Sequence, residues 1–395
     1  MDLSLTPELE EFRDEVRTWL EEHLVGEFAE HRGVGTSSDD VAWDVRLAWD
    51  RELAAGGWLC MGWPEEYGGR GASIDQQLVF ELEYARANPP YKATAAGQDL
   101  LGPTLLAFGS EEQKRRFLPR ISAAEEFWGQ GFSEPGAGSD LAAVRTKARL
   151  EDGEWVIDGQ KIWMSVGARA HWMYVLARTD PDAPRHQGLS MLLVPVDQPG
   201  VDVRPIRNIE GGADFCEVFF EGARTAEDMV VGGVNNGWKV AMGALGTERG
   251  TTLLAEHLRV QREIDLAISA ARSTGASRSA VMRAELASSW SAAKIMEWNG
   301  RRLIAAIKGA SGGDAATQAS ISKVFASERH QRIGEVAIRA MGPAAEVVGP
   351  DYELNPLQAM YLHARAESIY GGTTQIQLNV LAERALGLPR EPRRR

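Results

Sequence analysis

The sequence predicts a multi-domain protein of three consecutive regions. These are an N-terminal α-helical domain at 1–125, a middle β-barrel or β-sandwich domain at 126–234, and a C-terminal antiparallel four-helix bundle at 235–395. Apolar side chains recur at helical spacing near both ends of the chain, whereas in the middle they alternate with polar ones, as in strands. A chain of 395 residues, 44% of them hydrophobic, is also long enough to form cores in two or three domains.

Helices are expected through most of the first region. Thr6 and Pro7 suit the N-cap and first turn of a helix, and apolar residues from Leu9 to Leu20 recur on one of its faces. Further helical patterns are found at 41–55, 76–86, 98–108 and 111–120. Glycine, proline and polar residues predict irregular structure in the intervening segments.

A Gly-rich loop, Phe-Ser-Glu-Pro-Gly-Ala-Gly-Ser-Asp, opens the middle region. Pro135 removes a backbone donor, and Gly136 and Gly138 allow backbone angles and close approaches that other residues resist. Such a loop can offer bare N–H groups and the hydroxyls of Ser133 and Ser139 to a polar ligand.

Strands are expected after this loop. Residues 144–150 alternate between apolar and basic side chains, and Asp152-Gly153 and Asp158-Gly159 predict two turns. On the returning strand, period-two geometry places Trp163 and Ser165 on one face, where an aromatic plane beside a hydroxyl suits a flat ring with a hydrogen-bonding edge. Further strands are expected at 172–177, 189–194, 201–206 and 215–220.

The last region is predicted to be helical. Four long stretches rich in Ala, Leu, Glu and Arg, joined by short segments, indicate an antiparallel bundle. They lie at about 238–272, 277–309, 314–341 and 356–386.

Charge and composition exclude several classes of function. A formal charge of −13 argues against nucleic acid or an anionic membrane as partner, because both require basic patches. The acidic N-terminus lacks the apolar core of a signal peptide, and no run is long enough to span a bilayer, so an intracellular, cytoplasmic protein is expected. Cys60 and Cys216 are expected to be packed free thiols, and the seven histidines do not cluster, so no metal site is expected.

Four motifs in order along the chain resemble those of the acyl-CoA dehydrogenase family: GWPEEYGGRG, FSEPGAGSD, GQKIWMS and IYGGTTQIQ. The resemblance runs from about the first helix to the last twenty residues. It implies the fold of that family, FAD as cofactor, and the introduction of a double bond between the α and β carbons of an acyl-CoA thioester. It also implies that the reduced flavin is reoxidised by an electron-transfer flavoprotein.

The resemblance assigns cofactor contacts by position. Trp163 and Ser165 match the residues beside the isoalloxazine ring, although ordinary core packing is the alternative for Trp163. Thr373 and Gln375 match contacts to the FAD phosphates and sugar, and Ser139 also lies nearest the CoA side. The residues that match the family's flavin loop are Phe132, Ser133, Gly138 and Ser139.

The catalytic base departs from the common pattern of the family. Many members carry it as the glutamate of Tyr-Glu-Gly-Thr, but this chain has Tyr370-Gly371-Gly372-Thr373. Gly371 keeps a backbone N–H that could bind the thioester oxygen, but it cannot take a proton. Either the base has moved, or the chain does not dehydrogenate.

Glu248 is the expected replacement. It shares a helical stripe with Ala241, Ala244 and other uncharged residues, and burial raises the pKa of a carboxyl toward the range of a general base. A subset of the family, including isovaleryl- and long-chain acyl-CoA dehydrogenases, has its base on this helix just before a substrate-binding arginine, which matches Arg249. The alternatives are a structural ion pair for Glu248 and a surface cation for Arg249.

The adenine half of the cofactor site predicts a second subunit. In homotetrameric members a neighbouring subunit holds the adenine with an Arg-x-x-Phe-Gly segment and with a Gln before paired glycines. This chain lacks the aromatic at 271–275, and at 339–343 it has arginine for glutamine and Pro343, which cannot donate an N–H. It resembles α2β2 acyl-CoA dehydrogenases linked to steroid side-chain breakdown in actinobacteria. The alternative is a homotetramer that holds the adenine by other contacts.

Two other functions stay open. One is a flavin oxygenase or oxidase on the same fold, in which Gly371 reflects the loss of dehydrogenation, although Glu248 argues against it. The other is a non-catalytic subunit that stabilises an active partner. The acyl group is open as well: Gly371 leaves room for a bulky chain, and branched short chains, long chains and steroid-linked thioesters all remain candidates.

Overall fold

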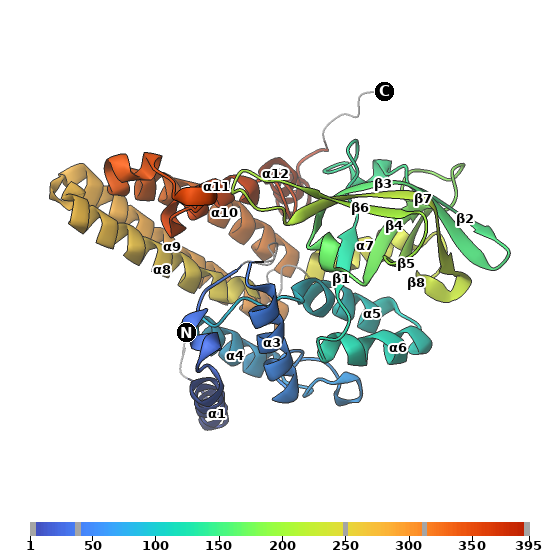
Figure 1. Ribbon diagram of the computed structural model, residues 1–395, viewed down its shortest axis with the longest axis horizontal. Coiled ribbons are helices and arrows are strands. Elements are labelled where there is room, and N and C mark those ends of the chain that lie inside the picture. The colour runs from blue at the N-terminus through green and yellow to red at the C-terminus, as the bar shows by residue number, and fades with distance from the viewer. Residues whose placement is uncertain (1–4, 36–40, 248–251, 310–313, 391–395) are drawn as a thin grey trace. The chain divides into compact units, whose positions relative to one another are not determined.

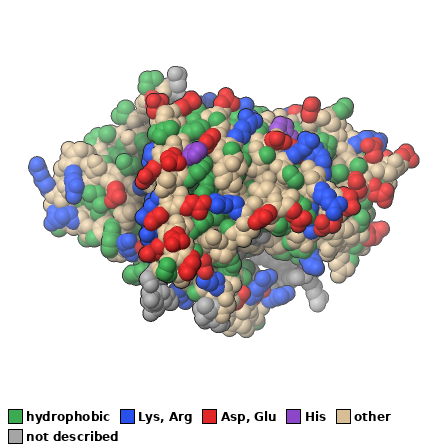
Figure 2. Space-filling view, turned by 90° about the horizontal axis from the view of Figure 1, so that it is seen from below, with side chains coloured by type: hydrophobic (Ala, Val, Ile, Leu, Met, Phe, Trp, Pro, Cys, Tyr) green, Lys and Arg blue, Asp and Glu red, His purple; other side chains and the backbone are tan. Residues whose placement is uncertain are grey.

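The computed structural model describes residues 5–35, 41–247, 252–309 and 314–390. The chain divides into two compact units, which are described in turn (Figure 1). The first comprises 1–208 and 212–248, and the second comprises 209–211 and 249–395. No helix within the described ranges is long and apolar enough to cross a membrane. On the face shown in Figure 2, Lys and Arg side chains are interspersed with Asp and Glu.

Three helices of the first unit begin at residues whose side chains cap them. Thr6 caps the first helix by accepting from Leu9 N, and Ser73 and Ser110 form capping boxes at the start of two others. These helices are α1 (Pro7–His23), α2 (Glu27–Glu30), α3 (Trp43–Ala55), α4 (Ile74–Ala87), α5 (Gly102–Phe108), α6 (Glu111–Ser122) and α7 (Gly237–Thr247). The expected helix at 98–108 differs in form, because 96–101 are a π-helix that leads into α5.

The strands of the first unit form one hydrogen-bonded sheet in the order β6-β7-β3-β2-β4-β5-β8, and β1 pairs in parallel with β4. They are β1 (Trp128–Gly131), β2 (Lys147–Glu151), β3 (Glu154–Ser165), β4 (Trp172–Arg178), β5 (Leu189–Pro195), β6 (Val201–Ile206), β7 (Phe215–Ala226) and β8 (Val230–Val231). The middle region is therefore a β domain, as the sequence predicts.

One of the two predicted turns is wrong. Asp152-Gly153 does join β2 to β3, with both residues at positive φ. At Asp158-Gly159, however, β3 continues along β7 with only a shift in register. A Cβ on Gly159 would lie 2.7 Å from Thr146 Cα, so the close approach of another backbone requires this glycine, not a turn.

Strand β4 lies between two cores. Tyr174 and Leu176 face a core shared with the N-terminal helices and α7, whereas Met173 and Val175 face a second core built from the sheet. This double burial explains why the segment is apolar throughout, and it fixes the strand that pairs with β1, directly before the Gly-rich loop.

The second unit is a helical bundle. Its helices are α8 (Thr252–Thr274), α9 (Ala280–Ile307), α10 (Ala315–Met341), α11 (Pro356–Glu367) and α12 (Thr374–Val380). Helices α8, α9, α10 and α11 contribute to one apolar core.

Two expected helices are each divided in the structure. The stretch at 238–272 becomes α7 in the first unit and α8 in the second. The stretch at 356–386 is interrupted between α11 and α12, where Gly371 and Gly372 have φ of +60° and +89° and cannot continue a right-handed helix.

Both cysteines are buried free thiols, as expected.

Candidate functional site

The Gly-rich loop follows β1 and turns back tightly. Glu134 and Ala137 exchange two backbone hydrogen bonds, of 3.1 and 3.0 Å, around the exposed Pro135 and Gly136. Beyond this turn Gly138 and the next residue, Ser139, are also exposed, and nothing lies within 4 Å of a Cβ placed on Gly138. The loop therefore presents an open backbone surface.

The start of the loop is anchored in the sheet. Phe132 is buried and packs edge-on against Tyr174, with 5.6 Å between ring centroids. Ser133 is half-buried, and its carbonyl accepts from Ile162 N of β3 at 3.0 Å. The loop and β3 are thus held together, which brings Ser133 close to the strand that carries Trp163 and Ser165.

A buried ion pair lies under the loop. Lys161 on β3 is fully buried, and its Nζ donates to Glu134 Oε1 at 2.9 Å and to Phe132 O at 3.0 Å. The same carboxylate accepts from Arg145 N at 2.7 Å and Thr146 N at 2.8 Å. Glu134 therefore joins the loop to β3 and to the segment entering β2, and the three hydrogen bonds to its carboxylate fix the loop's shape.

Burial and charge act in opposite directions on this pair. Burial lowers the pKa of Lys161 to about 8, although Glu134 opposes this shift. For Glu134, burial acts to raise the pKa, but Lys161 and the hydrogen bonds at Thr146 outweigh it and lower the pKa. Neither Lys161 nor Glu134 was predicted from the sequence as part of the site. The sequence did hold one indication of this pair: Glu134 and Lys161 have opposite charges and lie in two motifs, FSEPGAGSD and GQKIWMS, that were assigned to the same ligand.

Trp163 occupies a strained position on β3. The register with β7 shifts between Lys161 and Met164, so the alternation expected along the strand is broken here. Trp163 has φ of +63°, a left-handed conformation that is costly for a bulky residue, and its side chain is 59% exposed. Its ring meets Phe215 edge-on at 6.2 Å. A large aromatic plane is thus held in solvent next to Met164, which is fully buried.

Gly371 and Thr373 lie in the second unit, between α11 and α12, and Gln375 lies in the first turn of α12. Thr373 caps α12 by accepting from Ile376 N at 3.2 Å, and Gln375 is exposed. The carbonyl of Gly371 accepts from the side-chain amide of the fully buried Gln377 at 3.2 Å.

Glu248 and Arg249 lie outside the described residues. The part of their stripe that the structure describes is apolar, since Ala241 and Ala244 on α7 are fully buried.

The positions matched to the adenine half are engaged within the bundle. Arg339 Nη2 donates to Glu285 Oε1 at 2.8 Å, and Thr274 Oγ1 donates to Ala340 O at 2.8 Å. Pro343 lies in a 3-10 turn after α10.

Three segments of the chain match the acyl-CoA dehydrogenase N-terminal, middle and C-terminal domains, at 6–125, 129–223 and 235–386. The acyl-CoA dehydrogenase IpdE1 of Mycobacterium tuberculosis is 46% identical over 385 residues, which are 97% of this chain and 99% of that protein. IpdE1 of Mycolicibacterium smegmatis is 45% identical over 395 residues, again 97% and 99% of the two chains.

Solved structures of acyl-CoA dehydrogenases also resemble this chain. A chain of the Tcur3481-Tcur3483 steroid acyl-CoA dehydrogenase superposes with a TM-score of 0.86 at 30% identity, covering 99% of this chain and 100% of that chain. A chain of the ChsE4-ChsE5 complex from Mycobacterium tuberculosis gives 0.80 at 30% identity with the same coverage. The predicted order of helical, β and helical regions is confirmed. The chain therefore belongs to the acyl-CoA dehydrogenase family, whose members are flavoproteins.

Proposed function

We propose that the chain binds FAD and dehydrogenates an acyl-CoA thioester between its α and β carbons, with Glu248 as the base. The observation that carries the proposal is the exposed Trp163, held at positive φ next to a loop that a buried Lys161–Glu134 pair shapes. Strain of this kind persists where the surroundings enforce it, and it often marks a ligand site.

The residues of the first unit fit a flavin. The exposed indole of Trp163 offers a flat apolar surface, and Ser133 and Ser165 provide hydroxyls at half-buried positions. The open backbone at Gly138 and Ser139 suits the approach of a polar ligand, with Ser139 toward CoA. When bound, the flavin supplies the acceptor for the β hydride.

The second unit supplies further contacts in this proposal. Thr373 and Gln375 would hold the phosphates and sugar of FAD, and the backbone N–H of Gly371 would donate to the thioester oxygen. Such a donor stabilises the negative charge that develops on this oxygen as the α proton leaves. The buried apolar neighbours on α7 support Glu248 as a carboxylate in apolar surroundings, where its pKa rises toward that of a general base. Arg249 would bind the substrate.

An anaerobic visible-absorbance titration tests this function. The wild type, Glu248→Gln and the control Glu227→Gln, which changes an exposed glutamate, would be titrated with acyl-CoA thioesters from short branched to sterol-derived. We expect the flavin to bleach in the wild type and the control but not in Glu248→Gln. A bound flavin that no thioester bleaches, but that reacts rapidly with oxygen when reduced chemically, would instead indicate an oxidase or oxygenase.

We also propose that the chain works with a second acyl-CoA dehydrogenase-like subunit on a steroid-derived acyl group, and that an electron-transfer flavoprotein reoxidises it. The names of two similar structures describe pairs of chains, and one describes a steroid enzyme. The contacts of Arg339 and Thr274 within the bundle also support a role for another subunit at the adenine half. A homotetramer with one FAD per subunit after expression of this chain alone would contradict the proposal.

A further inference from the structure

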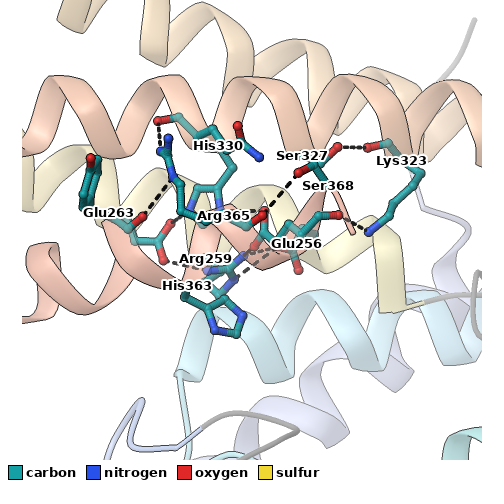
Figure 3. Close-up of polar contacts among 12 residues, drawn as sticks. Glu256, Arg259, Glu263, Lys323, Ser327, His330, His363, Arg365 and Ser368 are labelled. Atoms are coloured by element: carbon teal, nitrogen blue, oxygen red, sulfur yellow. Dashed lines mark hydrogen bonds and ion pairs between the residues drawn. The ribbon is translucent and has the colours of Figure 1, made fainter. Parts of the chain in front are cut away.

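Four ionisable side chains form a closed ring of contacts inside the second unit (Figure 3). Arg259 and Glu263 come from α8, His330 from α10, and Glu367 from the end of α11. Glu263 Oε1 lies 2.7 Å from Arg259 Nη1, and Glu263 Oε2 lies 2.8 Å from His330 Nε2. Glu367 closes the ring at 2.8 Å from His330 Nδ1 and 3.2 Å from Arg259 Nη2.

The ring requires His330 to be an imidazolium. Each of its two nitrogens faces a carboxylate oxygen, and a neutral imidazole has only one N–H to donate. The side chain is 2% exposed, so water cannot replace a missing donor. Burial and Arg259 act to lower the pKa of His330, but Glu263 and Glu367 outweigh them and raise it to about 9.

Other charged groups lie next to this ring, in addition to its four members. On α8, Glu256 also accepts from Arg259, at 3.2 Å from its Nε. On α11, His363 pairs with Glu210 at 3.1 Å. The charged groups that contact or act on the ring are Glu256 and Arg262 from α8, Lys323 from α10 and His363 from α11.

The ring leads directly to the loop that carries Gly371. The carbonyl of Glu367 accepts from Lys323 Nζ of α10 at 2.7 Å, and this ammonium also lies 4.5 Å from the ring centroid of Tyr370. Beyond Glu367, Thr374 N donates to Ser368 O at 3.0 Å. The end of α11 is thus tied to α8 through the Glu367 carboxylate and to α10 through its carbonyl, four residues before Gly371.

We propose that His330 is a positioning residue for the dehydrogenation: as an imidazolium it holds the end of α11 through Glu367 and so fixes where the next loop presents the Gly371 N–H. This inference rests on the proposed role of Gly371 toward the thioester. A ring of buried charges is a poor source of net stability, because apolar side chains of similar volume often do as well. What the ring provides is one geometry, since each of its four side chains contacts two others of the ring.

The test compares His330→Gln with a matched control, His23→Gln, in the flavin-bound enzyme. His23 also contacts a glutamate, Glu52, at 2.6 Å, but at a half-exposed place on α1. Glutamine can donate to one carboxylate but not to both. We expect His330→Gln to lower the rate of flavin reduction by acyl-CoA at least tenfold, with KM changed less than threefold, because the Gly371 contact strengthens in the transition state. The control should stay within twofold of the wild type.

Glu263→Gln is the milder variant and keeps the inference testable if His330→Gln fails to fold. It removes one of the two charges that hold the proton on His330, so the alkaline limb of the wild-type rate profile, expected near pH 9, should move to lower pH. Lys161, with a pKa of about 8, could also contribute to the pH–rate profile, but its contribution should not move in this variant. In parallel, 15N spectra of the histidines should show one ring with both nitrogens protonated at pH 8, absent from His330→Gln.

Two outcomes would overturn the inference. If His330→Gln lowers only the melting temperature and reduces its flavin at the wild-type rate, His330 is structural. If the alkaline limb stays in place in Glu263→Gln, the imidazolium does not control the rate. Failure of the proposed function looks different, because no acyl-CoA would then bleach the flavin of the wild type itself.

Discussion

The two units bury charge in different ways, and both have residues of the candidate site in a left-handed conformation, Trp163 in the first and Gly371 in the second. Under the Gly-rich loop, Lys161 has a single carboxylate partner, Glu134, and burial lowers its pKa to about 8. In the bundle, His330 has two carboxylate partners, and its pKa rises to about 9 despite similar burial. The comparison indicates that a second carboxylate partner can reverse the direction in which burial shifts the pKa of a buried cation.

The largest effect is expected from breaking the pair with one carboxylate. Lys161→Met would leave Glu134 buried with only its backbone donors, and we expect a loss of about 3–5 kcal/mol of unfolding free energy together with loss of flavin absorbance. Chemical denaturation and the visible spectrum measure both. The control, Lys114→Met, removes a lysine that pairs with Glu111 at the same 2.9 Å near the surface, and it should cost less than about 1 kcal/mol. Equal losses in the two variants would show that burial does not matter.

The second prediction concerns pH and has opposite signs in the two regions. The pKa of His330 is raised in the folded state, so its contribution is complete below about pH 6.5 and is lost as the pH rises through about 9. This contribution to the unfolding free energy is about 3 kcal/mol. The pKa of Lys161 is lowered to about 8, so the folded state gains stability as the pH rises from there toward 10.5. Unfolding free energies of the wild type and His330→Gln from pH 6 to 10 should therefore converge at the alkaline end.

The third prediction concerns the strain at Trp163 and compares its effects on stability and on flavin binding. Trp163 has φ of +63° in the sheet, where glycine would carry no such strain. We expect Trp163→Gly to raise the unfolding free energy of the flavin-free protein by about 1 kcal/mol and to weaken flavin binding, as read by denaturation and by flavin titration. Trp163→Phe, which keeps an aromatic plane and a Cβ, should bind flavin better than the glycine variant. A flavin affinity that is the same in all three proteins would remove Trp163 from the site.

The smallest effect is expected from the reverse kind of substitution, in which a glycine at positive φ is replaced by a residue with a Cβ. Gly371 has φ of +60°, so Gly371→Ala should cost about 1 kcal/mol of unfolding free energy and lower the rate of flavin reduction by shifting the N–H. Gly246→Ala is the control, because Gly246 lies within α7 with nothing within 4 Å of a new Cβ, and there alanine should stabilise the protein by up to about 1 kcal/mol. Denaturation curves of the two variants that shift in the same direction would contradict this interpretation.

Local patterns predicted much of the fold and of the candidate site. Capping residues such as Thr6, the apolar run of β4 and the alternation in β6 depend on neighbours in sequence, so their elements could be placed within a few residues. The Gly-rich loop and the Tyr370-Gly371-Gly372-Thr373 segment were likewise found as motifs, because they are contiguous.

Other features depended on partners that are distant in sequence. The role of Gly159 became evident only when Thr146 was seen against it, and the break in alternation at Trp163 only from the register with β7. His330 looked like an isolated histidine, because Glu263 and Glu367 lie 67 and 37 residues away. The sequence by itself thus determined the elements, their order and the motifs, since these follow from local chemistry. The tertiary structure decided which charges are buried and paired, because only packing brings such groups together and removes them from water.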